Sequence, residues 1–299
     1  MEMCPHAVVI RPNMEKYKFV SQQIRAIFYD ATFVIQPVSL DEAYLDFSNK
    51  VRTKNETDYA GTPAAGLADI ARRIESQLGI TVSIGLSYNK FLAKLASDLE
   101  KPRGFSIIGR AEAQAFLAPL SVSKINGVGK VTAQKLFGMG IRTIGQLQKM
   151  REIELVSSFG KFGRQLASYA HGHDNRKVIE NRPAKSISAE TTFSFDKRRS
   201  VDLIEAIKPL CERVSKRLIQ GNYAGSTIVL KMKTSDFKVL IRNRQLLNPT
   251  QKKEIIYENA VNLIEREANG RHFRLIGVGV SDICSANAAD PPNLFGTLG

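Results

Sequence analysis

A chain of 299 residues with 43% hydrophobic content is long enough to bury two or three cores, so we expect a multidomain globular protein. No apolar run approaches the roughly 20 residues of a membrane span, and residues 1–6 lack the basic-then-apolar layout of a secretory signal. We therefore expect a cytoplasmic protein with no membrane partner. Residues 1–108 hold 13 Lys and Arg against 12 Asp and Glu, so +13 of the net charge of +14 lies in residues 109–299. This excess favours a polyanionic partner, with a solubilising surface as the alternative.

The three cysteines, Cys4, Cys211 and Cys284, are widely separated in the chain. That spacing fits neither a disulfide framework nor a Cys-x-x-Cys metal site. We predict that all three are buried as small apolar residues in a reducing compartment.

Residues 33–47 connect two apolar β-type runs and place two adjacent acids, Asp41 and Glu42, near the junction. Neighbouring side chains on a regular strand point to opposite faces, so both carboxylates reach one ion only where a turn or bulge re-aims one of them. Pro37 and Ser39, just upstream, favour such an irregularity. Two carboxylates at a sheet edge are the hard oxygen ligands that Mg²⁺ needs in phosphoryl chemistry. Taken alone, however, an Asp-Glu dipeptide is more often an exposed acidic turn.

The remainder of residues 1–108 has a mixed α/β pattern. Thr62-Pro63 is a good helix start, and apolar residues follow at helical spacing until Gly79. The predicted elements after it are a strand over 80–86, a helix over 91–99 and a strand over 105–108. Helices on one face of a sheet are the natural packing for this order.

Residues 109–173 contain short helical patterns broken by glycines, which predicts a small all-helical unit. Ile125–Lys130 is typical of a helix-hairpin-helix, since Gly127 and Gly129 allow close approach of the backbone, and helix-terminal amides beside Lys130 can meet a phosphate. A glycine-rich turn between core helices is the alternative. Lys161, within Phe159–Arg164, marks a weaker second candidate.

His171, His173 and Asp174 lie on one short loop. Three such groups without a fourth ligand favour a structural turn over a metal site.

After a polar linker, the pattern changes to the β-α-β-β-α-β order of a split βαβ domain. The predicted strands are 186–195, 226–234, 237–246 and 272–283, and the predicted helices are 202–220 and 251–267. Alternation predicts one apolar sheet face, covered by the helix from Asp202, and one cationic face. Phe237, Val239 and Ile241 are assigned to the apolar face. The residues assigned to the cationic face, as contacts to a duplex backbone, are Lys231, Lys233, Lys238, Arg242 and Arg244. A merely solvated face is the alternative.

Five segments together resemble, in this order, the Y-family translesion DNA polymerases, in the branch of bacterial DNA polymerase IV. The segments are Ser39–Asp46, Gly85–Asp98, Lys101–Gly104, Ile125–Lys130 and Phe159–Gly163. The resemblance covers essentially the whole chain and implies an α+β multidomain fold. The implied domains are a partial palm at 1–108, a helical thumb at 109–173, a linker at 174–185, a little-finger domain at 186–284 and a mobile tail at 285–299.

The resemblance also implies an activity and its site. Asp41 and Glu42 become catalytic ligands of a two-metal Mg²⁺ site, and Lys101 and Ser39 become contacts of the incoming dNTP. The partners are primer-template DNA and dNTP, the setting is DNA repair on damaged templates, and the protein is a monomer. Leu294 and Phe295 resemble the short tail that reaches the sliding clamp, with a disordered tail as the alternative.

The sequence departs from the family at its beginning. Members open with a strand that carries another metal-binding aspartate and an aromatic sugar-discriminating residue, followed by a small fingers region, and this pattern is absent here. We therefore expect weak or absent polymerase activity, because Asp30 and Asp46 are poorly placed to substitute. A DNA-binding protein without catalysis is the second reading. A nucleotide cyclase would leave the helix-hairpin-helix and the cationic final domain unexplained, and a DNA glycosylase would not need the acid pair.

Overall fold

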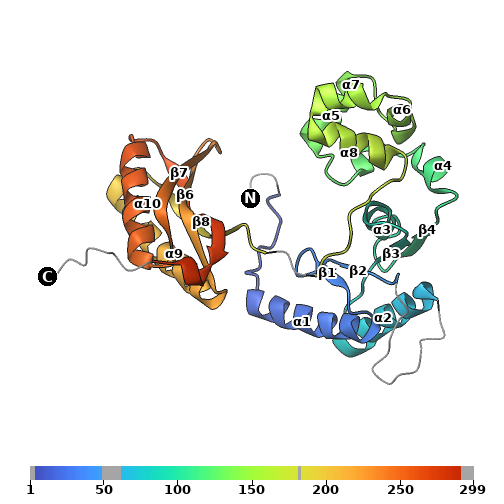
Figure 1. Cartoon of the computed structure of the whole chain (residues 1–299), viewed down its shortest axis with the longest axis horizontal. Helices are drawn as coiled ribbons and strands as arrows, with labels where there is room; N and C mark the ends of the chain where they lie inside the picture. Colours follow the sequence, from blue (N-terminus) through green and yellow to red (C-terminus); the bar gives the residue numbers. More distant parts are fainter. Residues whose placement is uncertain (1–3, 49–61, 181–182, 291–299) are drawn as a thin grey trace. The chain divides into compact units, whose positions relative to one another are not determined.

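The computed structural model describes residues 4–48, 62–180 and 183–290. The chain divides into two compact units, Met1–Asn181 and Arg182–Gly299, each with its own buried clusters (Figure 1). The first unit contains the predicted palm and thumb, and the second contains the predicted little finger. No helix among the described residues is long and apolar enough to cross a membrane.

The first unit opens with helices packed on two small sheets. Its elements up to residue 108 are α1 (Met14–Ala31), β1 (Ile35–Pro37), β2 (Ala43–Leu45), α2 (Pro63–Leu78), β3 (Ile84–Ser87), α3 (Lys90–Ser97) and β4 (Phe105–Ile108). Strands β1 and β2 form an antiparallel hairpin, whereas β3 and β4 pair in parallel. Helices α1 and α2 lie side by side and share a core with residues of β2, β3 and β4 (Figure 1).

Local sequence explains where the helices begin and end. The side chain of Thr62 caps α2 by accepting a hydrogen bond from the amide of Ala65, and Pro63 occupies the first helical position. Gly79 ends the helix at φ +68°, a conformation that glycine adopts without strain. The predicted helix between Thr62 and Gly79 is confirmed.

The helical part of the first unit consists of α4 (Ala113–Leu117), the 3₁₀ turn η1 (Val122–Lys124), α5 (Lys130–Gly138), α6 (Ile144–Gln148), α7 (Glu152–Phe159) and α8 (Lys161–Ala170). Its buried cluster includes Phe91, Leu92 and Leu95 of α3. The ring of Phe91 stacks on that of Tyr169 in α8, with centroids 4.3 Å apart. Helix α3 therefore belongs to the core of the helical part as well as to the sheet region.

Residues 172–179, which we call the strap, follow α8 and return to α3 and β1. The carbonyl of Gly172 accepts hydrogen bonds from the hydroxyl of Tyr88 and from the side-chain Nδ2 of Asn89, at 3.1 and 2.8 Å. The other ties run from the amide of Phe91 to the carboxylate of Asp174 (3.0 Å), from Lys90 Nζ to the carbonyl of Lys177 (3.2 Å), and from the amide of Ile179 to Gln36 Oε1 (3.1 Å). The first residues of the predicted linker are thus held to the first unit by hydrogen bonds.

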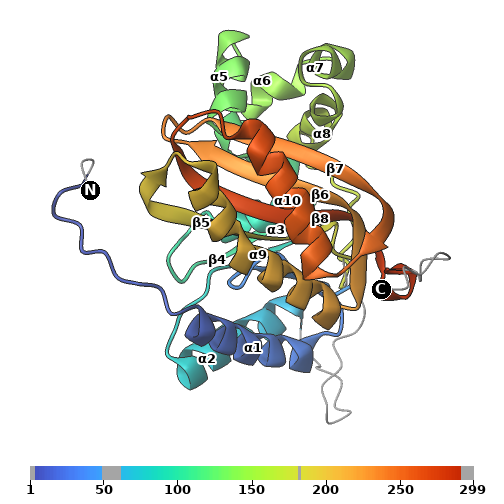
Figure 2. The ribbon, with the colours of Figure 1, turned by 90° about the vertical axis from the view of Figure 1, so that its left-hand side faces the viewer.

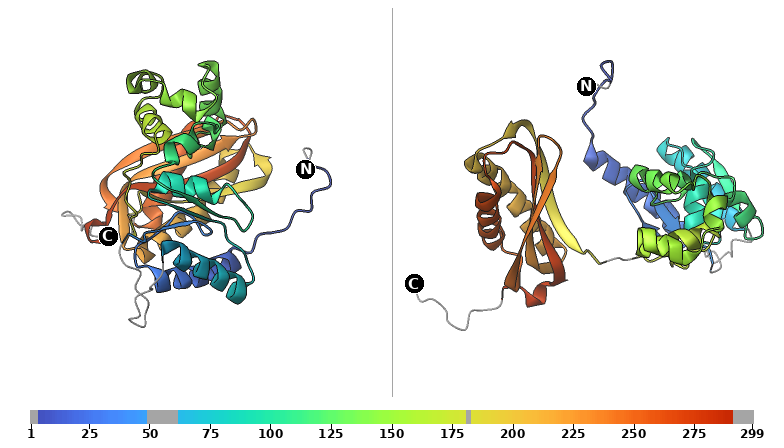
Figure 3. Two further views of the ribbon diagram at one scale, coloured as in Figure 1. Left: turned by 90° about the vertical axis from the view of Figure 1, so that its right-hand side faces the viewer. Right: turned by 90° about the horizontal axis from the view of Figure 1, so that it is seen from above.

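The second unit is a four-stranded antiparallel sheet with two helices on one face (Figures 2 and 3). Its elements are β5 (Ser186–Lys197), α9 (Ser200–Gln220), β6 (Tyr223–Thr234), β7 (Val239–Thr250), α10 (Lys253–Glu267), β8 (Phe273–Ser285) and the 3₁₀ turn η2 (Ala286–Ala288). The strand order is β5-β8-β6-β7, and α9, α10 and the sheet enclose one core. The predicted β-α-β-β-α-β order and the α+β multidomain class are confirmed.

The predicted division of β7 between the two sheet faces is wrong. In the β6–β7 register, Arg242 lies opposite buried Leu230, and Ile241 lies opposite Lys231. Directly opposed residues share a face, so Arg242 belongs to the helix-covered face, and its Nε donates to Glu267 of α10 at 2.6 Å. Arg244, opposite buried Ile228, is on the same face.

Two apolar residues of β7 lie instead on the open face. Val239 and Ile241 pair with Lys233 and Lys231, and their side chains are about half exposed. The physical reason is that β7 is the edge strand of the sheet. A central strand has one face covered by helices and the other face open. An edge strand is not divided so sharply, so alternation of apolar residues no longer identifies its core face.

Candidate active site and nucleic-acid interface

The two acids lie on the tight loop of the β1–β2 hairpin. The amides of Val38 and Ser39 both donate to the carbonyl of Glu42, at 2.9 and 3.2 Å, which closes the loop. The Ser39 hydroxyl accepts hydrogen bonds from the amides of Asp41 (3.2 Å) and Glu42 (3.0 Å) and donates to the Asp41 carboxylate. The loop positions both acids at the end of the hairpin, as the sequence predicts, and both side chains are exposed.

Hydrogen bonds lower the pKa of two acids in this region. The hydrogen bond from Ser39 holds the pKa of Asp41 below its ordinary value, with smaller contributions from the backbone amide of Asp41, Lys101 and Lys94. Burial acts to raise the pKa of Asp98, but hydrogen bonds from Lys101 and Lys94 outweigh it, and that pKa is also lowered. Asp41 and Asp98 are therefore ionised at neutral pH.

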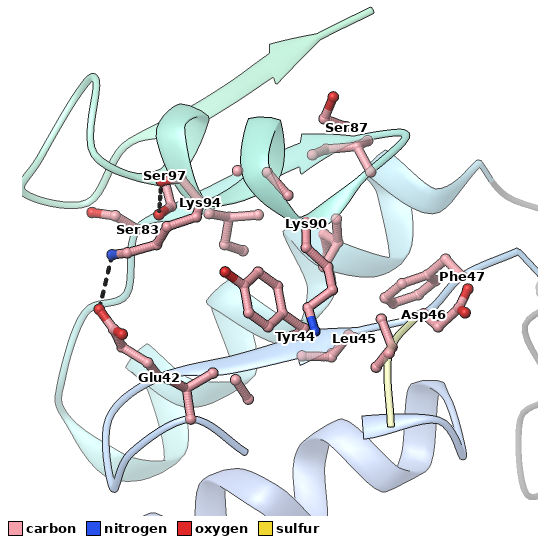
Figure 4. Close-up of a pocket in the computed structure, with 18 of the residues that line it drawn as sticks. Glu42, Tyr44, Leu45, Asp46, Phe47, Ser83, Ser87, Lys90, Lys94 and Ser97 are labelled. Atoms are coloured by element: carbon pink, nitrogen blue, oxygen red, sulfur yellow. Dashed lines mark hydrogen bonds and ion pairs between the residues drawn. The ribbon is translucent and has the colours of Figure 1, made fainter. Parts of the chain in front are cut away.

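Lys94 of α3 connects the acids to the Lys101 loop. Its Nζ lies 2.8 Å from Glu42 Oε1 and 3.1 Å from Asp98 Oδ2 (Figure 4). Burial acts to lower the pKa of Lys94, but its bonds to these two carboxylates raise the pKa above its ordinary value. Lys101 Nζ in turn lies 2.6 Å from Asp98 Oδ1. Lys94 and Asp98 were not singled out from the sequence, although their i, i+4 spacing within a predicted helix was a signal for such a pair.

Asp41, Glu42, Lys94 and Lys101 line a cavity of about 980 Å³. Its walls are formed by the β1–β2 hairpin, β3, α3, the Lys101–Arg103 loop and the strap (Figure 4). Ser39, in contrast, supports the loop from behind and is not part of the cavity wall. Carboxylates and lysines around a space of this size have the chemistry of metal ligands and phosphate partners, respectively.

The donor set fits one Mg²⁺ ion. Mg²⁺ is held by one or two carboxylates, with water and substrate phosphates at its other positions, and Asp41 and Glu42 supply two carboxylates. Over residues 4–48, 62–180 and 183–290, no group of three or more His, Cys, Asp or Glu side chains could hold a metal ion. Asp30 is occupied by Arg73, 2.7 Å away, and Asp46 lies at the far end of β2 from Glu42 (Figure 4). The two acids predicted to be poor substitutes thus do not join the pair.

The loop Ile125–Gly129 between η1 and α5 is the segment predicted to bind a phosphate. Gly127 adopts φ +96°, and a Cβ at this position would lie 3.3 Å from the ring of Phe162. Gly129 is the N-cap of α5, no side chain caps that end, and a Cβ there would meet no atom within 4 Å. The amides that begin α5 are therefore accessible beside the exposed Lys130. The first helix of the motif is only the three-residue turn η1.

Lys161 begins α8 directly after Gly160, whose φ is +60°. Lys161 is exposed, whereas nearby Arg164 is paired with Glu152 at 3.1 Å. The phosphate-binding roles of Gly127, Gly129, Lys130 and Lys161 stay predictions.

On the open face of the second unit, the cations have close partners. Lys231 lies 2.7 Å from Glu190 of β5, and Lys233 lies over the ring of Phe237, 4.6 Å from its centroid. Arg274, which sequence reasoning missed, lies 4.0 Å from the same centroid. Lys238 is in the turn before β7, paired with Asp236 at 2.8 Å and 80% exposed. Lys231 and Lys233 are on the face predicted for DNA, whereas Arg242 and Arg244 are not.

Three further sequence predictions have outcomes here. Asp174 is a structural residue, as predicted, because its carboxylate accepts from the amide of Phe91 and from Arg176. The prediction that all three cysteines are buried is wrong for Cys4, which is exposed, and for Cys284, which is half-buried. Cys211 is buried, and its burial raises its pKa to about 12. The candidate clamp residues Leu294 and Phe295 lie outside the described residues.

Comparisons with known proteins match the chain over nearly its whole length. Residues 1–98 match the impB/mucB/samB family, residues 110–141 the IMS family HHH motif, and residues 184–292 the impB/mucB/samB family C-terminal domain. A protein named DNA polymerase IV from Brucella melitensis is 50% identical over 294 residues, which cover 98% of this chain and 65% of that protein. DNA polymerase IV from Caulobacter vibrioides is 43% identical over 289 residues, covering 97% of this chain and 70% of the relative.

A solved structure of a Y-family DNA polymerase chimera is similar with a TM-score of 0.83 and 25% identity, over 95% of this chain and 81% of the chimera. The chain spans about two thirds of the length of the relatives from Brucella melitensis and Mesorhizobium japonicum, 65% and 66% respectively. These similarities agree with the order of motifs in the sequence and with the fold. The chain therefore belongs to the Y-family of DNA polymerases, within the impB/mucB/samB family to which it is matched along its length.

Proposed function

We propose that this protein is the catalytic and DNA-holding part of a translesion DNA polymerase, which adds deoxynucleotides to a primer on damaged templates during DNA repair. In the reaction the primer 3′ hydroxyl bonds to the α-phosphorus of a dNTP, and pyrophosphate leaves. The observation that carries the proposal is the acid pair Asp41 and Glu42 at the end of a hairpin, lining one cavity together with Lys94 and Lys101. Carboxylates for a metal and lysines for a triphosphate are the groups that phosphoryl transfer requires.

Each residue of this cluster has a distinct part in the proposal. Asp41 and Glu42 hold Mg²⁺, which when bound polarises phosphate oxygens and neutralises their charge. Lys101 contacts the phosphates of the dNTP. Ser39 acts at the nucleotide site indirectly, because its hydroxyl orders the backbone and carboxylate of Asp41. The ion pair with Lys94 holds the carboxylate of Glu42 at the cavity wall.

The remaining proposed contacts hold primer-template DNA. Gly127, Gly129, Lys130 and Lys161 bind backbone phosphates in the helical part, and Lys231 and Lys233 bind them on the open sheet face. Lys238, with an 80% exposed side chain, adds a contact at the β6–β7 turn. Arg242 and Arg244 are weaker candidates, because they lie on the other face and Arg242 is bonded to Glu267.

A second function, DNA binding without extension, is favoured by one observation. The described residues supply two carboxylates at the site and no third metal-binding group, whereas two-metal catalysis must hold both attacking and leaving oxygens. We therefore propose that a protein of these 299 residues alone extends primers weakly or not at all while it still binds primer-template DNA.

One pair of assays tests both functions. Primer extension with Mg²⁺ on undamaged and damaged templates is compared with binding of the same DNA, measured by fluorescence anisotropy. Any extension should be abolished by Asp41→Ala or Glu42→Ala and kept by Glu205→Ala, an exposed acid on α9. Extension that survives both hairpin substitutions would remove the acid pair from the mechanism. Failure to bind DNA at all would contradict both functions.

We also propose that the protein acts as a monomer in the cytoplasm, with Leu294 and Phe295 as contacts for the sliding clamp. Deletion of residues 291–299 should abolish clamp binding in a pull-down with purified clamp and leave DNA binding unchanged. Equal clamp capture by the full chain and the deletion variant would rule out this tail.

A further inference from the structure

The turn between β6 and β7 places a phenylalanine where the backbone favours glycine. Phe237 adopts φ +65°, in the left-handed region that strains most residues other than Gly, Asn and Asp. Hairpin turns usually have Gly or Asn at such a position. Backbone strain of this kind is concentrated at functional sites, so the presence of Phe237 here points to a use for its ring.

Hydrogen bonds around Thr234 hold this turn. The amide of Phe237 donates to the carbonyl of Thr234 at 3.0 Å, and the amide of Thr234 donates to the carbonyl of Lys238 at 2.9 Å. The Thr234 hydroxyl donates to the Asp236 carboxylate and accepts from the amide of Lys238 at 3.1 Å. A fixed backbone therefore presents the ring of Phe237, which is 58% exposed.

A β-bulge in β8 lies beside the turn. Lys233 of β6 is opposite Leu275, but the next residue, Thr234, is opposite Phe273, so Arg274 is an extra residue in β8. Phe273 belongs to the core beneath the helices, whereas Leu275 shares the open face with Lys233. On a regular strand residues 273 and 275 would lie on the same face. The bulge changes the direction of the side chains at Arg274.

The bulge and the strained turn bring two cations to one ring. Arg274 Cζ lies 4.0 Å from the centroid of the Phe237 ring, and Lys233 Nζ lies 4.6 Å from it. Both distances are within the range of cation–π attraction. Over the described ranges, neither Lys233 nor Arg274 takes part in an ion pair. The ring is thus the group that orders both cations.

Neighbouring cations are held in a different way. Lys231 and Lys238 each bond to a carboxylate, at 2.7 and 2.8 Å. A carboxylate orders a cation but offsets its charge toward a phosphate. An aromatic ring attracts a cation through its quadrupole and carries no net charge, so Lys233 and Arg274 keep their full charge for an anionic ligand.

We propose that Phe237 is a positioning residue for DNA binding, whose ring holds Lys233 and Arg274 as a fully charged pair for backbone phosphates. The inference rests on the proposed DNA-holding function of the open face, and it adds the group that orders two of the cations there. Order before binding raises affinity, because each long side chain that is immobilised on association lowers it. The ring itself needs no contact with DNA.

The test measures binding of primer-template DNA to the full chain by fluorescence anisotropy at several salt concentrations. Phe237→Leu keeps an apolar side chain and the backbone strain but removes the aromatic face, so it should weaken binding about three- to tenfold at every salt concentration. The slope of log K against log salt should stay unchanged, because both cations still reach phosphates in the complex.

Two further variants accompany this measurement. Phe237→Trp should keep the affinity of the parent protein, because Trp is the best aromatic partner of a cation. Phe195→Leu, at an exposed phenylalanine of β5, is the matched control and should also keep it.

A second background separates positioning from direct contact. In a protein with Lys233→Ala and Arg274→Ala the ring has no cations to hold, so adding Phe237→Leu should change the affinity by less than about twofold. A loss of the same size in both backgrounds would overturn the proposal, because the ring would then act on DNA directly or through stability. Equal affinity of Phe237→Leu and the parent would overturn it and leave the proposed function intact, whereas absence of DNA binding by the parent would overturn both.

Discussion

Each of the two hairpin acids is held by a different neighbour. Asp41 depends on the hydroxyl of Ser39, and Glu42 depends on the ammonium group of Lys94. The two contacts come from different parts of the chain, because Ser39 is in the same loop whereas Lys94 is on α3. The surroundings of either acid can therefore be changed by a substitution that leaves the neighbour of the other acid in place.

Ser39→Ala should raise the pKa of Asp41, because the largest influence that lowers it is removed. It should also destabilise the loop by about 0.5–1 kcal/mol, since two amides lose their acceptor. The folded-state pKa of Asp41 lies below its unfolded value, so the ionised group stabilises the fold above the unfolded pKa, and this contribution is lost as the pH falls through the folded pKa.

As the pH falls, the free energy of unfolding should therefore decrease less in Ser39→Ala than in the parent protein. NMR titration of the Asp41 carboxyl and urea unfolding at several pH values measure the two effects. Ser76→Ala, at an exposed serine on α2, is the matched control. An unchanged Asp41 titration in Ser39→Ala would show that the hydroxyl does not set this pKa.

Gly127 and Gly129, in the loop Ile125–Gly129, are predicted to have separable roles. Gly127→Val should lower the free energy of unfolding by about 1–2 kcal/mol, because its φ of +96° strains any other residue and Phe162 lies 3.3 Å from the new Cβ. Gly129→Val should leave the melting temperature nearly unchanged, since its Cβ meets nothing within 4 Å, but should weaken DNA binding by shielding the amides of α5 from a phosphate.

Calorimetry and anisotropy measure these two effects independently. Equal DNA affinity of Gly129→Val and the parent protein would indicate that Gly129 only shapes the turn.

At the scale of elements, the strap joins the helical part to the acid hairpin. Lys90, only 4% exposed, bonds to Gln36 of β1 at 2.6 Å and to the carbonyl of Lys177 in the strap, and it lies over the ring of Tyr44 in β2. Lys90→Met keeps the length of the side chain but removes its donors. The buried carbonyl and amide oxygens then lose a partner, which should cost about 1–3 kcal/mol in the free energy of unfolding.

Urea unfolding checks this value, and hydrogen exchange should become faster in β1 and β2. Lys216→Met, at an exposed position of α9, is the control. Stability equal to that of the parent would mean that the strap does not depend on Lys90.

The distribution of charged residues between the two faces of the sheet leads to a prediction about DNA binding. Replacing Lys231 and Lys233 by Ala should weaken binding to all sequences alike and reduce the slope of log K against log salt by about 2. Replacing Arg242 and Arg244 should change that slope little, because these residues lie on the helix-covered face. The Arg242 substitution should instead lower stability, since Glu267 loses a bidentate partner.

Anisotropy titrations at several salt concentrations compare the two double variants. A larger loss of slope in the arginine variant would place the duplex on the opposite face of the sheet.

Some elements were predictable from sequence because their signals are local. Helix α2 has its cap, proline and terminal glycine within its own sequence, and the acid hairpin has Pro37 and Ser39 beside it. Helix α1 carried an equally local signal, the Asn13 cap, that sequence reasoning did not use. The strap was not predictable, because its hydrogen bonds join residues more than 80 positions apart, such as Tyr88 and Gly172.

The difference between local and long-range signals also applies to the site. Asp41, Glu42 and Lys101 were found by their motifs, and the cavity brings them together. The face of Arg242 was not predictable, because strand alternation identifies the core only when one side of the strand is sealed, and β7 lies at an edge.

At the scale of the whole molecule, the two units have separate cores. The second unit encloses its sheet, α9 and α10 in one buried cluster, and Asp290 after η2 closes it by bonding to Thr250 at 2.6 Å. Residues 183–290 alone should therefore fold cooperatively and bind DNA with a salt-dependent affinity.

Expression of that fragment, followed by calorimetry and anisotropy, checks the prediction. A fragment that unfolds without a cooperative transition would indicate that the second unit needs the first for its stability.

The eight residues of α3 serve two parts of the first unit at once. Lys94 faces the acids, Phe91 and Leu95 belong to the core of the helical part, and all three line a second cavity of about 460 Å³ together with residues 123–128. A substitution in α3 that displaces Phe91 or Leu95 should therefore also displace Lys94 and lengthen its ion pair with Glu42.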